Sequence, residues 1–269
     1  MIRQNFNADW TVEKGVGNSR MNSFLGNTQT QTVHLPYDAM IHEARTPDTK
    51  NGAQTGFYPG GEYIFQKHFT APQAWQGKPV SLGFEGVYQT ALVYLNGWLL
   101  TRNVNGYAEF TVEAGPYLKY GADNLLKVIA DNSLEPNSRW YTGSGIYRPV
   151  RLLVGNKVYL PQDTVRITTR EADEGFALLD VTAQVQSAST ITERVTLQQT
   201  ICREGTAVLT DRQNLLLQPG ESRIVSFRYC VDSPALWSPE NPNLYTSTMQ
   251  VLEGEEELDR EETGFGIRT

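Results

Sequence analysis

Apolar and polar residues alternate along most of this chain, in short runs that end at Gly, Pro, Asn or Asp. Alternation with a period of two places successive side chains on opposite faces of a strand. No convincing helical periodicity extends over roughly twelve residues or more. The pattern therefore predicts an all-β protein. The clearest predicted strands in the first part of the chain are Glu62–Phe69, Val80–Phe84, Ala91–Asn96, Asn124–Ala130 and Val150–Val154.

The alternation breaks at Gly155-Asn156-Lys157, where a turn predicts a domain boundary. We assign residues 1–156 to a first sandwich, in which Asn96-Gly97 indicates a hairpin turn, and residues 157–262 to a second. About seven strands in about 105 residues suit an immunoglobulin-like sandwich for the second. Its predicted strands include Thr164–Thr169, Phe176–Gln186, Ile191–Arg203, Ala207–Leu217 and Ser222–Val231.

Residues 2–60 show the least regular pattern. Asp9–Val12 is suited to begin a strand, and Gln31–Leu35 alternates before it stops at Pro36. From Asn51 to Gly61 the sequence is rich in glycine, which predicts an exposed loop. Long loops of this kind often carry binding residues, although most are only connections.

The densest group of chemically versatile side chains lies between the predicted strands that end at Ala130 and begin at Val150. There, Gly143 and Gly145 free the backbone for a positive φ or a close approach. Aromatic rings with polar edges and two guanidinium groups surround these glycines, namely Arg139, Trp140, Tyr141, Tyr147 and Arg148. One interpretation is a packed corner that closes a sandwich.

A second interpretation is a loop that presents Asn137, Ser138 and Trp140 to a sugar, because aromatic faces and amides suit sugar rings. Both interpretations can hold in one loop. The acidic residues of the first half, such as Glu85, Glu109 and Asp131, form no pair that the sequence places in one pocket. We expect these three to be surface carboxylates.

Charge is distributed unevenly along the 269 residues, whose formal net charge is −7. Residues 1–156 hold 13 Lys and Arg against 12 Asp and Glu, whereas residues 157–269 hold 10 against 18. This distribution argues against a nucleic-acid partner. The acidic run Glu253–Glu262 predicts a solvated hairpin end or linker.

The sequence contains no run of about 18 apolar residues, so we expect no membrane span. Its first residues, MIRQNFNADW, lack the apolar segment of a signal peptide, so we expect a cytoplasmic protein, with a periplasmic or secreted one as the alternative if the natural chain begins earlier. The two cysteines, Cys202 and Cys230, lie in strand-like runs and are expected to be buried free thiols, with a disulfide as the alternative. The three histidines show no metal-ligand spacing. We predict neither a metal nor a cofactor.

Several segments resemble the signatures of glycoside hydrolase family 2, which contains β-galactosidases, β-glucuronidases and β-mannosidases. Arg139–Arg148 (RWYTGSGIYR) is similar to the signature that closes the family's N-terminal sugar-binding domain. Trp237–Tyr245 resembles the segment before the last strand of the second domain, and Glu262–Thr269 the join to the catalytic (β/α)₈ barrel. Pro36-Tyr37-Asp38 resembles the family's Pro-His-Asp, with Tyr in place of His.

The resemblance implies a jelly-roll sandwich, then an immunoglobulin-like sandwich, then residues 263–269 as the start of a connection to a barrel that this sequence lacks. It implies a parent enzyme, most like a β-galactosidase, that hydrolyses terminal β-glycosides with retention. The family's two catalytic glutamates lie on the barrel, and one follows an Asn. This chain contains no Asn-Glu dipeptide. We therefore expect no catalytic residue here and no activity of the chain alone.

The resemblance also assigns roles in the first domain. Asn137, Ser138 and Trp140 match the segment that reaches the bound sugar in the intact enzyme, although Ser138 stands where well-known β-galactosidases have Asp. The residues Arg139, Tyr141, Gly143, Gly145, Tyr147 and Arg148 match the structural part of the signature. The loop Gln54–Tyr58 is a second candidate for sugar contact. The implied partners are a carbohydrate and the barrel, with a homo-oligomer also open.

Two other interpretations stay open. A stand-alone carbohydrate-binding module would show a row of exposed aromatic rings, for which Tyr88, Tyr94, Trp98 and Tyr107 are the candidates, although alternation places several of them inside. A structural or adhesive protein would need no sugar contact. Support of a barrel instead predicts exposed apolar side chains near Trp140 and in the Trp237–Tyr245 segment.

Overall fold

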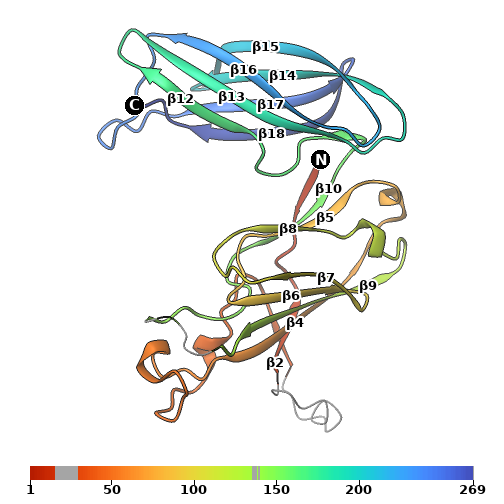
Figure 1. The fold of residues 1–269 in the computed structure, drawn as a ribbon, viewed down its shortest axis with the longest axis vertical. Coiled ribbons are helices and arrows are strands. Elements are labelled where there is room, and N and C mark those ends of the chain that lie inside the picture. Colours follow the sequence, from red (N-terminus) through yellow and green to blue (C-terminus); the bar gives the residue numbers. More distant parts are fainter. Residues whose placement is uncertain (16–29, 135–137, 139, 269) are drawn as a thin grey trace. The chain divides into compact units, whose positions relative to one another are not determined.

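A computed structural model describes residues 1–15, 30–134, 138 and 140–268 (Figure 1). The chain divides into two units, Ile2–Val154 and Gly155–Thr269, and Met1 groups with the second. In the described residues all regular elements are strands or 3-10 turns of three or four residues, which confirms the all-β prediction. The 3-10 turns are η2 (Met40–His42), η3 (Gly52–Thr55), η4 (Gln73–Trp75) and η5 (Gly115–Tyr117).

The first unit is a sandwich of two antiparallel sheets. One sheet has the strand order β1-β10-β5-β8, and the other has the order β3-β2-β4-β9-β6-β7. The strands are β1 (Ile2–Asn5), β2 (Trp10–Lys14), β3 (Gln31–Val33), β4 (Gly61–Thr70), β5 (Val80–Phe84), β6 (Thr90–Leu95), β7 (Trp98–Asn103), β8 (Phe110–Glu113), β9 (Asp123–Asn132) and β10 (Val150–Val154).

Alternation along these strands determines which side chains fill the first core. In β9 every second residue from Asn124 to Asn132 is buried, because those positions share one face of the strand. Both sheets contribute large side chains to this core, including the fully buried Trp10, Phe65 and Phe84. The hairpin predicted at Asn96-Gly97 joins β6 to β7. Its two residues have φ of 52° and 89°, which suits a tight two-residue turn.

The second unit is a sandwich of two four-stranded antiparallel sheets. In one sheet β13 lies between β16 on one side and β11 and β12 on the other, and the other sheet has the order β15-β14-β17-β18. The strands are β11 (Val158–Tyr159), β12 (Arg166–Ala172), β13 (Phe176–Ser187), β14 (Glu193–Arg203), β15 (Thr206–Leu217), β16 (Ser222–Asp232), β17 (Tyr245–Glu253) and β18 (Glu256–Phe265).

Of two predictions for the second unit, the burial of the cysteines needs correction. Both cysteines are free, as expected, but Cys230 is exposed and Cys202 is only half-buried. The reason is register, because Cys230 lies on the outward face of β16, between the buried Tyr229 and Val231. The acidic run forms the turn of the β17–β18 hairpin and continues as the paired strand β18, which confirms the hairpin end and excludes the linker. The assignment of residues 1–156, 157–262 and 263–269 to separate domains and a connection stays a prediction.

In the part of the chain that the structure describes, no helix has the length and apolar character needed to cross a membrane. Within the same residues, no group of three or more His, Cys, Asp or Glu side chains is arranged to hold a metal ion.

Candidate functional site

The signature segment connects β9 to β10 and is fastened to the first sandwich through its backbone. Gly145 exchanges two hydrogen bonds with Tyr88, each of 3.0 Å between N and O. The φ of Gly145 is 134°, and a Cβ there would lie 2.7 Å from the carbonyl oxygen of Tyr37 and 3.0 Å from the ring of Phe65. Glycine is therefore required at this position both for its φ and for space, as the pattern of the segment predicted.

Asp38 is the polar centre of this region. Its Oδ2 accepts a hydrogen bond from the Tyr141 hydroxyl at 2.6 Å, and its Oδ1 accepts from the backbone N–H groups of Ser144 at 2.9 Å and Met40 at 3.0 Å. A Cβ on Gly143, whose φ is 72°, would lie 2.8 Å from Oδ2. One carboxylate thus holds two separate loops in one arrangement.

Tyr141 also packs against the glycine-rich loop. The rings of Tyr58 and Tyr141 meet edge to face, with centroids 5.3 Å apart. The guanidinium of Arg45 lies 6.0 Å from the ring centre of Phe57 and 5.8 Å from that of Tyr58. Burial, and then the hydrogen bond to Asp38, raise the pKa of Tyr141, so its hydroxyl remains a donor at neutral pH. The structure therefore brings together the two candidate segments that the sequence could only name separately.

The candidate sugar-contact residues differ in exposure. Trp140 is 63% exposed, whereas Ser138 is half-buried and donates a hydrogen bond from Oγ to the carbonyl of Trp140 at 2.8 Å. Asn137, and Arg139 of the structural signature, lie outside the described residues. The exposed indole face is the group in this loop that is best suited to pack against a sugar ring.

The rest of the signature is structural in its contacts. The hydroxyl of Tyr147 donates to the carbonyl of Gly106 at 2.7 Å, and the Arg148 guanidinium lies 5.6 Å from the ring centre of Tyr147. Ile146 is fully buried in the core. This half of the segment forms a packed corner, whereas sugar contact by the half that holds Trp140 stays a prediction.

Exposure of the other predicted aromatic residues is mixed. Among the four candidates for an exposed row, Trp98 and Tyr107 are exposed, whereas Tyr88 is buried and Tyr94 is half-buried under the Lys127 ammonium. In the Trp237–Tyr245 segment Leu244 is exposed but Tyr245 is buried. The three expected surface carboxylates are accessible: Glu109 is exposed, Asp131 is half-buried and Glu85 pairs with Arg151 at 2.6 Å.

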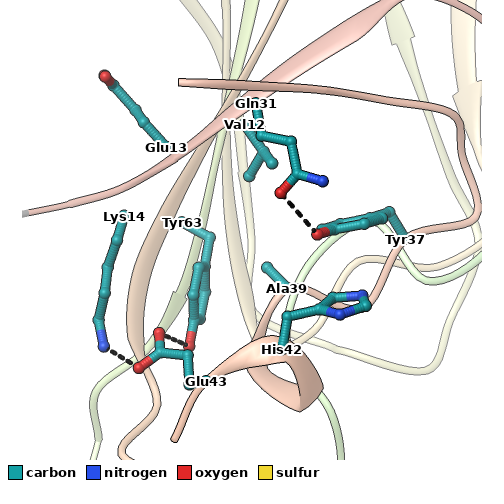
Figure 2. Close-up of a pocket in the computed structure, with 9 residues that line it drawn as sticks. All are labelled: Val12, Glu13, Lys14, Gln31, Tyr37, Ala39, His42, Glu43 and Tyr63. Atoms are coloured by element: carbon teal, nitrogen blue, oxygen red, sulfur yellow. Dashed lines mark hydrogen bonds and ion pairs between the residues drawn. The ribbon is translucent and has the colours of Figure 1, made fainter. Parts of the chain in front are cut away.

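A pocket of about 220 Å³ lies beside this region, and the sequence did not indicate it (Figure 2). The ends of β2 and β3, the segment from Tyr37 to Glu43, and β4 meet there. Its lining residues are Val12, Glu13, Lys14, Gln31, Tyr37, Ala39, His42, Glu43 and Tyr63. The residues come from four separate stretches of the chain, which is why no local motif announces the pocket. Asp38 was equally missed as a site residue, although its Pro-Tyr-Asp context resembled a family motif.

The chain contains two all-β sandwiches, and the first carries an aromatic loop held by a carboxylate. Comparison with known proteins identifies the family. Residues 10–177 match the glycosyl hydrolase 2 galactose-binding domain-like family, and residues 158–268 match the glycosyl hydrolases family 2 model. The chain belongs to glycosyl hydrolase family 2.

Relatives carry several enzyme names. A β-galactosidase of Bacteroides ovatus is 33% identical over 99% of this chain, which covers 32% of that protein. A β-glucuronidase of Formosa agariphila is 26% identical over 98% of this chain, which covers 29% of that protein. A crystal structure of a family 2 member from Bacteroides cellulosilyticus superposes with a TM-score of 0.90 at 29% identity, over 100% of this chain and 35% of that one. The chain thus spans about a third of the length of these relatives.

Proposed function

We propose that this chain is the non-catalytic N-terminal portion of a family 2 glycosidase, most like a β-galactosidase, and that its first sandwich shapes the substrate pocket. The observation that carries the proposal is Trp140, an exposed indole on a loop that Asp38 holds in place. A large apolar side chain kept in water on a fixed loop is suited to contact a ligand.

The rest of the reaction belongs to residues outside this chain. A retaining glycosidase requires two carboxyl groups about 5–5.5 Å apart, and the proposal places both on the barrel. The role of the two sandwiches is then to orient a sugar ring against that barrel and to support it. The match to a galactose-binding domain-like family supports a carbohydrate as the ligand. The identity to a β-galactosidase favours galactosides over glucuronides.

A fusion tests the proposal. The chain is joined to the part of the Bacteroides ovatus relative that follows the matched region, and hydrolysis of p-nitrophenyl β-galactoside and β-glucuronide is measured. We expect no turnover by the chain alone and turnover of the galactoside by the fusion. Trp140→Ala in the fusion should lower kcat/KM for the galactoside about tenfold.

The matched control is Trp98→Ala, which removes an indole of similar exposure from the β6–β7 hairpin. This variant should leave kcat/KM unchanged. Equal effects of the two substitutions would mean that loop 138–144 has no special contact with substrate. Sugar binding by the chain alone that is lost in Trp140→Ala would favour a carbohydrate-binding module instead.

A further inference from the structure

The pocket beside β2 combines an apolar floor with a rim of hydrogen-bonding groups. Val12 and Ala39 are buried and form apolar lining, whereas Gln31, Glu43 and Lys14 present polar ends (Figure 2). This combination is typical of binding sites for small ligands, in which an apolar surface receives the ligand and a few polar groups orient it.

Hydrogen bonds within the rim fix the positions of its polar groups. The Tyr63 hydroxyl donates to Oε1 of Glu43 at 2.7 Å, and the Lys14 ammonium contacts the other oxygen of the same carboxylate. The Tyr37 hydroxyl donates to Oε1 of Gln31 at 3.4 Å, a long and weak hydrogen bond (Figure 2). Because that contact is weak, a ligand hydroxyl can replace it at small cost.

Contacts with two neighbouring rings restrict the rotation of the Tyr37 side chain. It stacks on His42 with centroids 5.0 Å apart and planes inclined by 17°, and it meets Phe65 edge to face. Burial, and then the nearby Asp38, raise the pKa of Tyr37, so its hydroxyl stays protonated at neutral pH. The pocket therefore presents a preorganised hydroxyl and an amide at one end and a carboxylate with an ammonium at the other.

Size and charge restrict the ligand. Drug-sized ligands occupy pockets of about 300–1,000 Å³, so a cavity of about 220 Å³ suits one ring. The charged side chains that face the pocket are Lys14 and Glu43, which pair with each other, whereas the Glu13 carboxylate points away from the other lining groups (Figure 2). Because these two charges already neutralise each other, an added ionic group would meet no unpaired charge of opposite sign, so a neutral ligand is favoured.

We propose that this pocket binds a single neutral sugar ring, with Gln31 and Tyr37 at one side of the ring and Glu43 at the other. The polar rim offers both donors and acceptors, which is what a ring bearing several hydroxyl groups requires. None of these residues belongs to the signature segment. The inference does not depend on the role proposed for Trp140.

The test is a titration of the ¹⁵N-labelled 269-residue chain with methyl β-galactoside, methyl β-glucuronide and glycerol. We expect saturable shifts of the amide signals of Ala39, His42 and Tyr63 with the galactoside, at a Kd on the order of 10 mM or tighter. The glucuronide should bind at least about threefold more weakly, because its carboxylate would lie near Glu43, and the Lys14 ammonium already pairs with Glu43. Glycerol, which lacks a ring, should give no saturable shifts.

Substitutions assign the binding to the pocket. Gln31→Ala and Tyr37→Phe should each raise the Kd for the galactoside about threefold to tenfold, since each removes one hydrogen-bonding group. Thr32→Ala, at the exposed neighbouring position of β3, is the matched control and should leave the Kd unchanged. Trp140→Ala should also leave it unchanged, which separates this site from the signature loop.

Three results would overturn the inference. The first is no saturable shift with the galactoside, and the second is an equal response to glycerol. The third is a Kd that rises in neither Gln31→Ala nor Tyr37→Phe while the spectra of both variants show an intact fold.

Discussion

The two sandwiches use the same alternation of residues for different purposes. In the second, long strands such as β14 and β15 are joined by a tight turn, and most of the core is aliphatic. In the first, long irregular segments interrupt the strands, and the segments from Tyr37 to Glu43 and from Trp140 to Ser144 carry buried or half-buried polar contacts. The difference teaches that the loop-to-loop polar contacts around Asp38 depend on the irregular connections of the first sandwich, whereas the second has a more regular framework.

The largest expected effect comes from the signature segment that connects β9 to β10 in the first sandwich. Gly145→Ala places a Cβ at a φ of 134° and 2.7 Å from a backbone oxygen, so strain and steric conflict add. We expect a loss of about 4 kcal/mol in the free energy of unfolding. Urea denaturation followed by circular dichroism measures this.

The control for this glycine lies in the second sandwich. Gly205 has a φ of 78° in the β14–β15 turn, but a Cβ added there would meet no atom within 4 Å. Gly205→Ala should cost only about 1 kcal/mol. Equal losses in the two variants would show that the connection in the first sandwich is no more constrained than an ordinary turn.

The second-largest expected effect tests the packing of the core of the second sandwich. Leu197 is fully buried in β14, whereas Leu216 on β15 is 50% exposed. Leu197→Ala should lower the free energy of unfolding by about 3 kcal/mol because it leaves a cavity, and Leu216→Ala should change it by less than about 0.5 kcal/mol. Thermal denaturation of the pair is the measurement. A small loss in Leu197→Ala would mean that the second core can collapse around the missing side chain.

A smaller effect is expected from Asp38, the polar centre of the region around the signature segment. Asp38→Asn replaces an acceptor of the Tyr141 hydroxyl with an amide, and we expect a loss of about 2 kcal/mol. Tyr141→Phe removes only the donor and should cost about 1 kcal/mol. Urea denaturation gives both values, and the amide shifts of Ser144 and Met40 report whether the loops separate. Unchanged shifts and stability in Asp38→Asn would show that this carboxylate does not hold the loops.

The smallest effect is a pH dependence in the second sandwich. Hydrogen bonds from Arg228 and Arg170 lower the pKa of the half-buried Asp180. A lowered folded-state pKa means that this stabilisation is present above the unfolded-state value and is lost as pH falls through the folded one. Between about pH 6 and about pH 2, Tm should therefore fall less steeply in Asp180→Asn than in the unaltered chain.

Glu204→Gln is the control for this titration, because Glu204 is exposed and its contact with Arg203 is 3.8 Å long. Its Tm should follow the unaltered chain at every pH. Parallel Tm curves for Asp180→Asn and the unaltered chain would show that the two arginines add no acid-sensitive stability.

The strands could be predicted from the sequence, whereas the residues of the candidate site could be predicted only in part. Val80–Phe84 and Val150–Val154 were predicted with their observed limits, because short apolar runs bounded by Pro or Gly indicate such strands. The signature glycines were also recognisable, since positive φ leaves few other residues. Asp38 and Glu43 were not, because their partners Tyr141 and Tyr63 lie far away along the chain. Local pattern carries no information about such pairs.

Asp180 on β13 binds Arg170 on β12 and Arg228 on β16. The position of Arg228 on β16 has a consequence for solubility. β16 is an edge strand of its sheet. It is 11 residues long, and its residue Ile224 faces outward and is exposed. The unpaired backbone groups of an edge strand with apolar side chains can pair with a strand of a second chain, and this pairing can begin aggregation. The charged groups of Arg223 and Arg228 on this strand oppose that addition, so we expect the second sandwich to resist edge-to-edge association at high concentration.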